Sequence, residues 1–310
     1  MSFILLGILN SQAVAGGAGV AGYVAGGSPT GGGTEYSTVD RFAFPSDIRS
    51  VLSTGLSEAK DALAGFSNVA VAGYVAGGNN VSNNDVDEIE KFAFSTDSRS
   101  VLASTLSSNR DQLTGFQNTG TAGYGAGGQT STSVSTVDKV AYSDDTRSTL
   151  GTGLSQANRQ PMGFEHSNTA GYRAGGVDYP LTIDKFAFPS DSRTTLAATL
   201  SASGSSGGAM SNPTTAGYIH LGFTSTYSTT VDKLTYSTDS RSTLATGLSL
   251  GRIAVTGFQD TDTAGYFAGG NNAGGAITTV DKFDFPSDAR STLATGLSIA
   301  RYSAAGFENG

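Results

Sequence analysis

Five basic residues occur at nearly the same point of a repeated sequence, and their chemistry suits ligand binding. They are Lys60, Arg110, Arg159, Arg252 and Arg301. An arginine recognises a carboxylate through paired N–H donors, so several cations near one end of a central channel would suit an anionic or sugar ligand. The alternative is that each cation pairs with an acidic residue of an adjacent repeat and only stabilises the fold.

Acidic residues also recur, at two positions of every repeat. The first set is Asp40, Glu90, Asp138, Asp184, Asp232 and Asp281. The second set lies two residues before an arginine and gives the pairs Asp47 and Arg49, Asp97 and Arg99, Asp145 and Arg147, Asp191 and Arg193, Asp239 and Arg241, and Asp288 and Arg290. Catalysis needs one asymmetric site, whereas these residues recur six-fold. We therefore predict a structural Asp–Arg pair and turn cap in each repeat.

Other residues give little sign of catalysis or metal binding. His166 and His220 recur in no other repeat and lack a metal-ligand partner at a usable spacing. Residues 85–88 (Asp-Val-Asp-Glu) could hold calcium, but the loop lacks an EF-hand pattern. The chain has no cysteine, which excludes disulfides, cysteine-based zinc sites and a cysteine nucleophile. We expect no enzymatic activity, no metal and no cofactor.

The elements that position these residues are set by an internal repeat. The tripeptide Ala-Gly-Tyr ends at Tyr23, Tyr74, Tyr124, Tyr172, Tyr218 and Tyr266. Each unit contains four short stretches of strand character, separated by turn residues, and no sustained helical period. Four strands in roughly 50 residues, repeated six times, predict an all-β, six-bladed β-propeller of four-stranded blades over residues 21–310.

The two ends of the repeat array predict how the ring closes. Innermost strands are expected within 56–66, 106–116, 154–164, 200–210, 248–258 and 297–307. The Ala-Gly-Tyr strand at 21–27 has no innermost strand before it, and the stretch at 298–308 has no partner after it. The C-terminal strand should therefore complete the N-terminal blade, which removes two exposed sheet edges.

The repeat resembles the kelch family in three features. These are a glycine pair after the tyrosine strand (for example Gly26 and Gly27), a period near 50 residues, and an arginine at the start of the innermost strand. The resemblance implies a propeller. The blade tryptophan of that family is absent, and its space is assigned to leucines: Leu56, Leu106, Leu154, Leu200, Leu248 and Leu297.

One repeat and the N-terminus depart from the pattern. Around residues 200–222, Gly204 replaces the cation and Met210 replaces a phenylalanine, through drift or because this blade is a contact site. Residues 1–20 form a leader outside the propeller, with an apolar run that no Lys or Arg precedes, unlike a signal peptide. The run comprises Phe3, Ile4, Leu5, Leu6, Ile8 and Leu9. The leader resembles those of structural proteins of tailed bacteriophages, which implies anchoring to other virion subunits.

These observations favour a non-enzymatic structural or adhesion protein on the exposed surface of a bacteriophage virion, within a multi-subunit assembly. Its loops would contact host-surface glycans through Asn79, Asn80, Tyr179, Asn271 and Asn272. A net charge of −8 argues against nucleic-acid binding, and no apolar run is long enough to span a membrane. The alternatives are a bacterial extracellular glycan- or protein-binding propeller and an enzyme of the galactose-oxidase or sialidase kind. The latter is disfavoured by the missing cysteine and by the lack of an asymmetric acid–tyrosine–arginine cluster.

Overall fold

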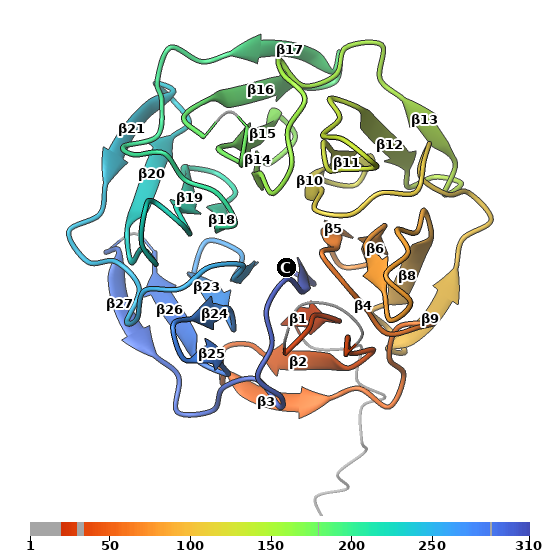
Figure 1. The fold of residues 1–310 in the computed structure, drawn as a ribbon, viewed down its shortest axis with the longest axis horizontal. Helices are drawn as coiled ribbons and strands as arrows, with labels where there is room; N and C mark the ends of the chain where they lie inside the picture. Colours follow the sequence, from red (N-terminus) through yellow and green to blue (C-terminus); the bar gives the residue numbers. More distant parts are fainter. Residues whose placement is uncertain (1–19, 30–33, 179, 286) are drawn as a thin grey trace, which may run out of the picture.

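The computed structural model describes residues 20–29, 34–178, 180–285 and 287–310. They form six four-stranded antiparallel sheets arranged as blades around a central axis (Figure 1). The predicted six-bladed propeller is therefore confirmed. The apolar leader residues and Tyr179 lie outside the described residues. Among those described, no helix is long and apolar enough to cross a membrane.

The blades follow one another along the chain, and the strands of each blade run in order from the axis outwards. Blades 1 to 3 are β28 (Ala305–Glu308), β1 (Ala21–Ala25), β2 (Val39–Ala43) and β3 (Ile48–Val51); β5 (Ala64–Asn68), β6 (Ala72–Ala76), β8 (Ile89–Ala93) and β9 (Ser98–Val101); and β10 (Thr114–Asn118), β11 (Ala122–Ala126), β12 (Val137–Ala141) and β13 (Arg147–Thr149). Blades 4 to 6 are β14 (Met162–His166), β15 (Ala170–Ala174), β16 (Ile183–Ala187) and β17 (Ser192–Thr195); β18 (Gly208–Asn212), β19 (Ala216–His220), β20 (Val231–Thr235) and β21 (Ser240–Thr243); and β22 (Thr256–Asp260), β23 (Ala264–Ala268), β26 (Val280–Asp284) and β27 (Ala289–Thr292). Two short pairs lie in loops: β4 (Lys60–Asp61) with β7 (Asn79–Asn80), and β24 (Asn271–Asn272) with β25 (Gly275–Ala276).

The ring closes as predicted. Strand β28 pairs antiparallel with β1, with Ala305 opposite Ala25 and Glu308 opposite Gly22. The two ends of the repeat array thus complete a single four-stranded blade, in which β28 is the innermost strand.

The innermost strands are shorter than the sequence suggests. In blade 2 the innermost strand predicted at 56–66 begins only at Ala64, because the residues before it cross from blade 1 and bond to loops, Lys60–Asp61 as the short strand β4. Leu56 N donates to Ser37 O at 2.8 Å and Lys60 N donates to Tyr36 O at 3.3 Å. The basic residue of each repeat therefore lies in this crossing segment rather than in the innermost strand.

Packing between blades explains the Ala-Gly-Tyr motif. All five residues of strands such as β11 are buried, because each blade is covered by its neighbours on both faces. A Cβ atom on Gly22 would lie 2.1 Å from the Phe258 ring of the adjacent blade, so only glycine fits there. In five blades the tyrosine stacks on a phenylalanine of its own innermost strand, as Tyr124 does on Phe116 with ring centroids 4.9 Å apart. In blade 5 the tyrosine, Tyr218, lies opposite Met210. The core is thus made of six layers between blades.

The two faces of the ring carry different segments. The face that we call the mouth face carries the crossing segments between blades and the loops between the second and third strands of each blade. The opposite face carries the remaining turns. Strand β1 runs from the opposite face to the mouth face, since Ala25 pairs with Ala305, a residue of the cavity described below. Residues 20 and 21 therefore lie at the opposite face.

Candidate functional site

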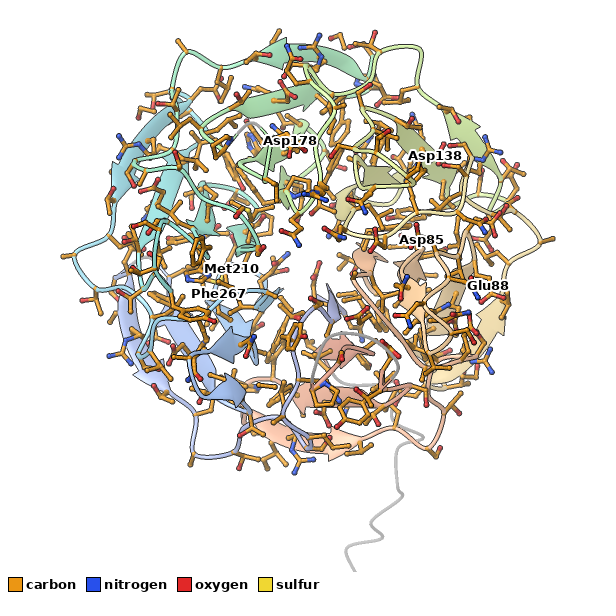
Figure 2. The ribbon with its side chains drawn as sticks, viewed as in Figure 1. Asp85, Glu88, Asp138, Asp178, Met210 and Phe267 are labelled. Atoms are coloured by element: carbon orange, nitrogen blue, oxygen red, sulfur yellow. The ribbon has the colours of Figure 1, made fainter. Side chains whose placement is uncertain are left out.

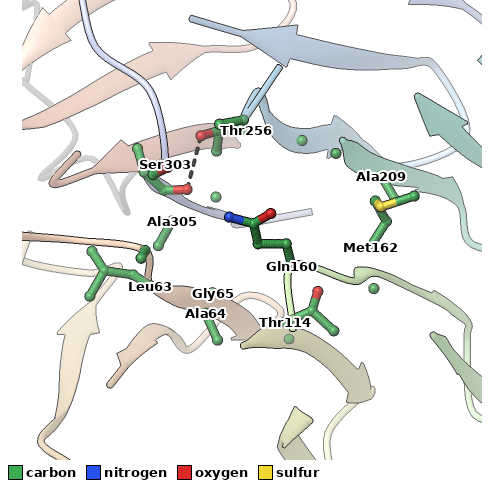
Figure 3. Close-up of a pocket in the computed structure, with 18 of the residues that line it drawn as sticks. Leu63, Ala64, Gly65, Thr114, Gln160, Met162, Ala209, Thr256, Ser303 and Ala305 are labelled. Carbon is green, nitrogen blue, oxygen red and sulfur yellow. Dashed lines mark hydrogen bonds between the residues drawn. The ribbon is translucent and has the colours of Figure 1, made fainter. Parts of the chain in front are cut away.

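A cavity of about 140 Å³ opens at the centre of the mouth face (Figure 3). All six blades contribute to it through the last residues of the crossing segments and the first residues of the innermost strands. Thr114 and Thr256 supply hydroxyl groups, and the side chain of Gln160 lies near its centre (Figure 3). Roughly 150 Å³ holds one six-membered ring. The volume therefore suits a small group or the end of a larger ligand.

A ring of residues in left-handed backbone conformation surrounds this cavity. The six residues have φ between 52° and 55° and are Ala62, Gln112, Gln160, Ser206, Ala254 and Ser303. Five of the six steps around the ring are closed by a backbone N–H donating to the preceding member's carbonyl, at 2.5–2.9 Å. Among the described residues, the step from Ser206 N to Gln160 O has no such bond. There Ser206 Oγ donates instead to Gln160 Oε1 at 2.5 Å.

Glycines make the axis narrow beneath the cavity. A Cβ atom on Gly115 would lie 1.9 Å from Gly65 O of the neighbouring blade, and one on Gly306 would lie 2.0 Å from Gly257 O. The innermost strands thus approach backbone to backbone, which a larger residue would prevent.

A buried polar cluster lies along the axis beyond the glycines. The fourth residue of each full-length innermost strand, with its counterpart in β28, forms it; the members are Glu308, Ser67, Gln117, Glu165, Ser211 and Gln259. Gln117 Nε2 donates to Glu308 Oε1 at 2.7 Å and to Glu165 Oε1 at 3.3 Å, and Gln259 Nε2 donates to the same Glu165 oxygen at 3.1 Å. Burial raises the pKa of Glu308 to about 7. Burial, with the nearby charge of Glu308, raises the pKa of Glu165 as well. Nothing in the repeat pattern indicated this cluster, because its residue types vary between blades.

The predicted cationic rim requires correction. Lys60, Arg110, Arg252 and Arg301 are all fully buried, and each contacts a carboxylate of the blade that its crossing segment enters. Arg110 Nη2, for example, donates to Asp138 Oδ2 at 3.0 Å and to Gly125 O at 3.1 Å. Because these four side chains are fully buried, they offer no surface to a ligand. Arg159 alone of the five stays partly exposed, and its Nη1 donates to Gln129 Oε1 of blade 3.

The predicted Asp–Arg turn pairs also require correction, because each aspartate bonds to the preceding blade instead. Asp191 accepts from Tyr124 Oη at 2.7 Å and from Lys139 Nζ at 2.6 Å. The other turn aspartates contact a tyrosine and a basic residue in the same way: Asp47, Asp97, Asp145, Asp239 and Asp288. All six turn aspartates have positive φ, between 49° and 58°. The prediction of an Asp–Arg pair within each turn did not take this backbone conformation into account.

The arginines of those turns reach the other set of acids. Arg290 Nη1 lies 3.7 Å from Asp281 Oδ1, and Arg49, Arg99, Arg193 and Arg241 contact the matching acid of their own blades at 3.5–3.9 Å. Arg147 donates instead to Thr105 O and to Thr149 Oγ1. Asp281 also accepts from Ser249 N and Arg252 of the crossing segment and from Thr292 Oγ1 of β27, so this acid is held by two segments.

Blade 4 holds its buried acid differently from blades 1, 2, 3 and 6. Asn158 stands where those four blades carry the buried cation, and it donates to Gly175 O at 2.9 Å. Arg173 on β15 is fully buried and lies directly across from Asp184. The charge of Asp184 thus has a cation from the neighbouring strand in place of the crossing segment.

The remaining candidates have structural partners. Asp85 Oδ1 accepts from Asn79 Nδ2 at 3.0 Å, and Glu88 Oε2 accepts from Lys60 Nζ at 3.2 Å. The part of the chain that the structure describes contains no group of three or more His, Cys, Asp or Glu suited to a metal ion. His166 stacks on Tyr236 with centroids 4.6 Å apart. His220 is buried beside Ser228 O, and burial lowers its pKa to about 4.

Side chains of all six blades surround the central axis (Figure 2), and those at the rim of the mouth cavity differ in chemistry from blade to blade. The residues that precede the ring members are Tyr302, Asp61, Asp111, Arg159, Ser205 and Ile253. Blades 2 and 3 thus present carboxylates, and burial raises the pKa of Asp61 to about 7 and that of Asp111 in the same direction. On blade 5, Phe223 pairs with Ser205 through a backbone bond at 2.9 Å and is 46% exposed. The degenerate repeat therefore forms a distinct part of the mouth rim.

Comparisons with known proteins support the fold. No model of a protein family matches the chain, and no curated protein matches its sequence. Among solved structures, that of YjhT is similar, with a TM-score of 0.67 over 87% of this chain and 97% of that chain, at 14% identity. A likeness at this level of identity supports a shared propeller architecture. The kelch and bacteriophage resemblances of the sequence stay predictions.

Proposed function

We propose that this protein is a non-enzymatic binding propeller that recognises a cell-surface ligand at the mouth cavity, as a structural or adhesion component of a bacteriophage virion. The observation that carries the binding proposal is the cavity itself. It is a polar hollow at the centre of one face, and the hydrogen-bonded ring around it is open at one step. Concave sites with a few convergent polar groups are where ligands usually bind.

The arrangement of acids favours binding over catalysis. The acids that recur on the third strand of each blade are buried, and most of them are neutralised by cations. The two unusual acids, Glu165 and Glu308, lie beyond the glycine constriction and away from the mouth cavity. A hydrolase needs an acid or nucleophile within reach of its substrate, and the residues lining the cavity include neither an acid nor a base.

The position of the N-terminal connection suits display of the mouth face. The chain enters the propeller at residues 20 and 21, on the face opposite the cavity. Anchoring through the leader to other virion subunits would thus leave the mouth face clear for a host-surface glycan. The alternative is a bacterial extracellular propeller, which would use the same face without a virion.

The test is binding of the fluorescently labelled full chain to a panel of bacterial cells. Gln160→Trp fills the mouth cavity, and Val71→Trp places the same side chain on the opposite face, where Val71 is 53% exposed. We expect the wild type and Val71→Trp to bind equally and Gln160→Trp to lose binding, with unchanged thermal unfolding. Equal binding by both variants would refute the mouth as the site. For the virion role, removal of residues 3–9 should abolish incorporation into particles, and unchanged incorporation would contradict it.

A further inference from the structure

We propose that the mouth cavity at blades 4 and 5 binds one neutral sugar ring, held by Gln160 and Ser206 and stacked against Phe223. The proposal rests on the proposed function and specifies its ligand. It follows from three independent features of this part of the mouth: an open step in the backbone ring, an exposed aromatic residue, and the charge of the surrounding rim.

The open step offers hydrogen-bonding groups that the rest of the ring has already used. At the other five steps a carbonyl and an N–H satisfy each other. Between Gln160 and Ser206, the Ser206 N–H and the Gln160 carbonyl have no such bond, and a side-chain amide and a hydroxyl lie beside them. This gives donors and acceptors within one small area. Adjacent hydroxyls of a sugar each donate and accept, so they match such a set.

Phe223 is the aromatic residue next to this step. Its backbone bonds to Ser205, the residue before Ser206, and its ring meets Tyr227 edge-on at 6.2 Å and 85°. Both side chains are more than a third exposed. In the other blades, the residue that makes the equivalent backbone contact with the residue before the ring member is Ser28, Asn79, Gln129, Val177 or Asn271. An exposed aromatic face beside polar groups suits the apolar C–H face of a sugar ring.

Size and charge define the sugar further. The cavity of about 140 Å³ accepts one ring rather than a chain of rings. Asp61 and Asp111 lie on the rim at blades 2 and 3, and Arg159 lies on the rim at blade 4, but none of the three is among the residues that line the cavity. The lining carries no charged side chain, so an anionic sugar would enter the cavity without a cation to compensate its charge. A neutral terminal hexose or N-acetylhexosamine of a longer glycan is therefore the expected ligand.

The experiment measures binding of methyl glycosides to the full chain by ligand-observed NMR and calorimetry. The probes are neutral hexosides and N-acetylhexosaminides, with the methyl glycoside of N-acetylneuraminic acid as the charged comparison. We expect at least one neutral glycoside to bind and the charged one not to bind. Phe223→Ala and Gln160→Ala should each weaken binding at least ten-fold.

Matched controls separate a specific contact from a general loss of structure. Val177→Ala alters the equivalent residue of blade 4, and Gln112→Ala removes the same side chain from a closed step of the ring. Both should change affinity less than two-fold. Binding of the charged glycoside alone, or equal losses in Phe223→Ala and Val177→Ala, would overturn the proposal.

The outcomes also separate this proposal from the proposed function. Cell binding that Gln160→Trp abolishes, but that neither glycosides nor periodate oxidation of the cell surface reduces, would overturn the sugar ligand and leave the mouth as a binding site. Absence of binding to every surface and every glycoside would overturn both.

Discussion

The axial pair of glutamates should make the protein less stable as the pH rises, and Glu308→Gln should remove most of this effect. Glu308 is 5% exposed and shares the amide of Gln117 with Glu165. Its pKa rises from 4.5 to about 7 because burial penalises the charged form. The folded state therefore binds the proton more tightly than the unfolded state does. The stabilisation from the protonated acid is complete below pH 4.5 and is lost as the pH rises to about 7.

The magnitude follows from the size of the shift. A change from 4.5 to about 7 is worth roughly 3 kcal/mol. Of this, roughly 2 kcal/mol should disappear between pH 5.5 and pH 8.5, because at pH 5.5 the unfolded glutamate is already ionised and the folded one is not. Both pH values, 5.5 and 8.5, lie above the isoelectric point of about 4.7, where solubility would be poorest.

The assay is urea-induced unfolding of the full chain at pH 5.5 and pH 8.5. Glu308→Gln keeps the acceptor for Gln117 and cannot ionise, so its free energy of unfolding at pH 8.5 should exceed that of the wild type by up to roughly 3 kcal/mol. Asp284→Asn, which alters an exposed carboxylate of β26, is the control and should leave the pH dependence unchanged. A Glu308→Gln variant with the pH profile of the wild type, or one less stable at pH 8.5, would refute the reasoning.

Three further predictions concern the contacts that hold the blades together, each measured by urea or thermal unfolding. Tyr124→Phe removes the 2.7 Å hydrogen bond to Asp191 and should lower the free energy of unfolding by about 1.5 kcal/mol, whereas Tyr227→Phe on the surface should lower it little. Equal effects of the two substitutions would contradict a structural role for the contact between blades. Gly115→Ala places a Cβ atom 1.9 Å from Gly65 O and should lower the free energy of unfolding by about 3 kcal/mol or more. A Cβ atom on Gly151 would have no neighbour within 4 Å, so Gly151→Ala should be tolerated. A stable Gly115→Ala protein would show that the innermost strands can separate. Arg252→Met leaves the buried Asp281 without its nearest cation and should lower the free energy of unfolding by about 3 kcal/mol. Arg241 is partly exposed and lies 3.9 Å from Asp232, so Arg241→Met should not cause a loss of this size.

The blade count and the closure of the ring could be predicted because they depend on periodicity. Ala-Gly-Tyr recurs once per blade because each glycine packs against a side chain of the neighbouring innermost strand, and each tyrosine packs on its own innermost strand. That side chain is a phenylalanine in five blades and Met210 in blade 5. The unmatched strands at residues 21–27 and 298–308 could be combined into one four-stranded blade, and β28 pairs with β1 in that way. The lengths of the innermost strands could not be predicted as well, because the crossing segment before Ala64 has a similar composition but bonds to a loop.

The partners of the charged residues were decided by the tertiary structure. Sequence placed Asp47 two residues from Arg49, yet the left-handed backbone at Asp47 directs it to Tyr266 and Lys282 of the preceding blade. The basic residues predicted for the channel are buried because the crossing segment directs their side chains into the blade that it enters, as Arg110 contacts Asp138. The polar axial cluster and the open step at Ser206 likewise depend on six separate strands meeting at one axis. A repeat specifies what each blade contains, and the contacts between blades depend on how the closed ring brings distant segments together.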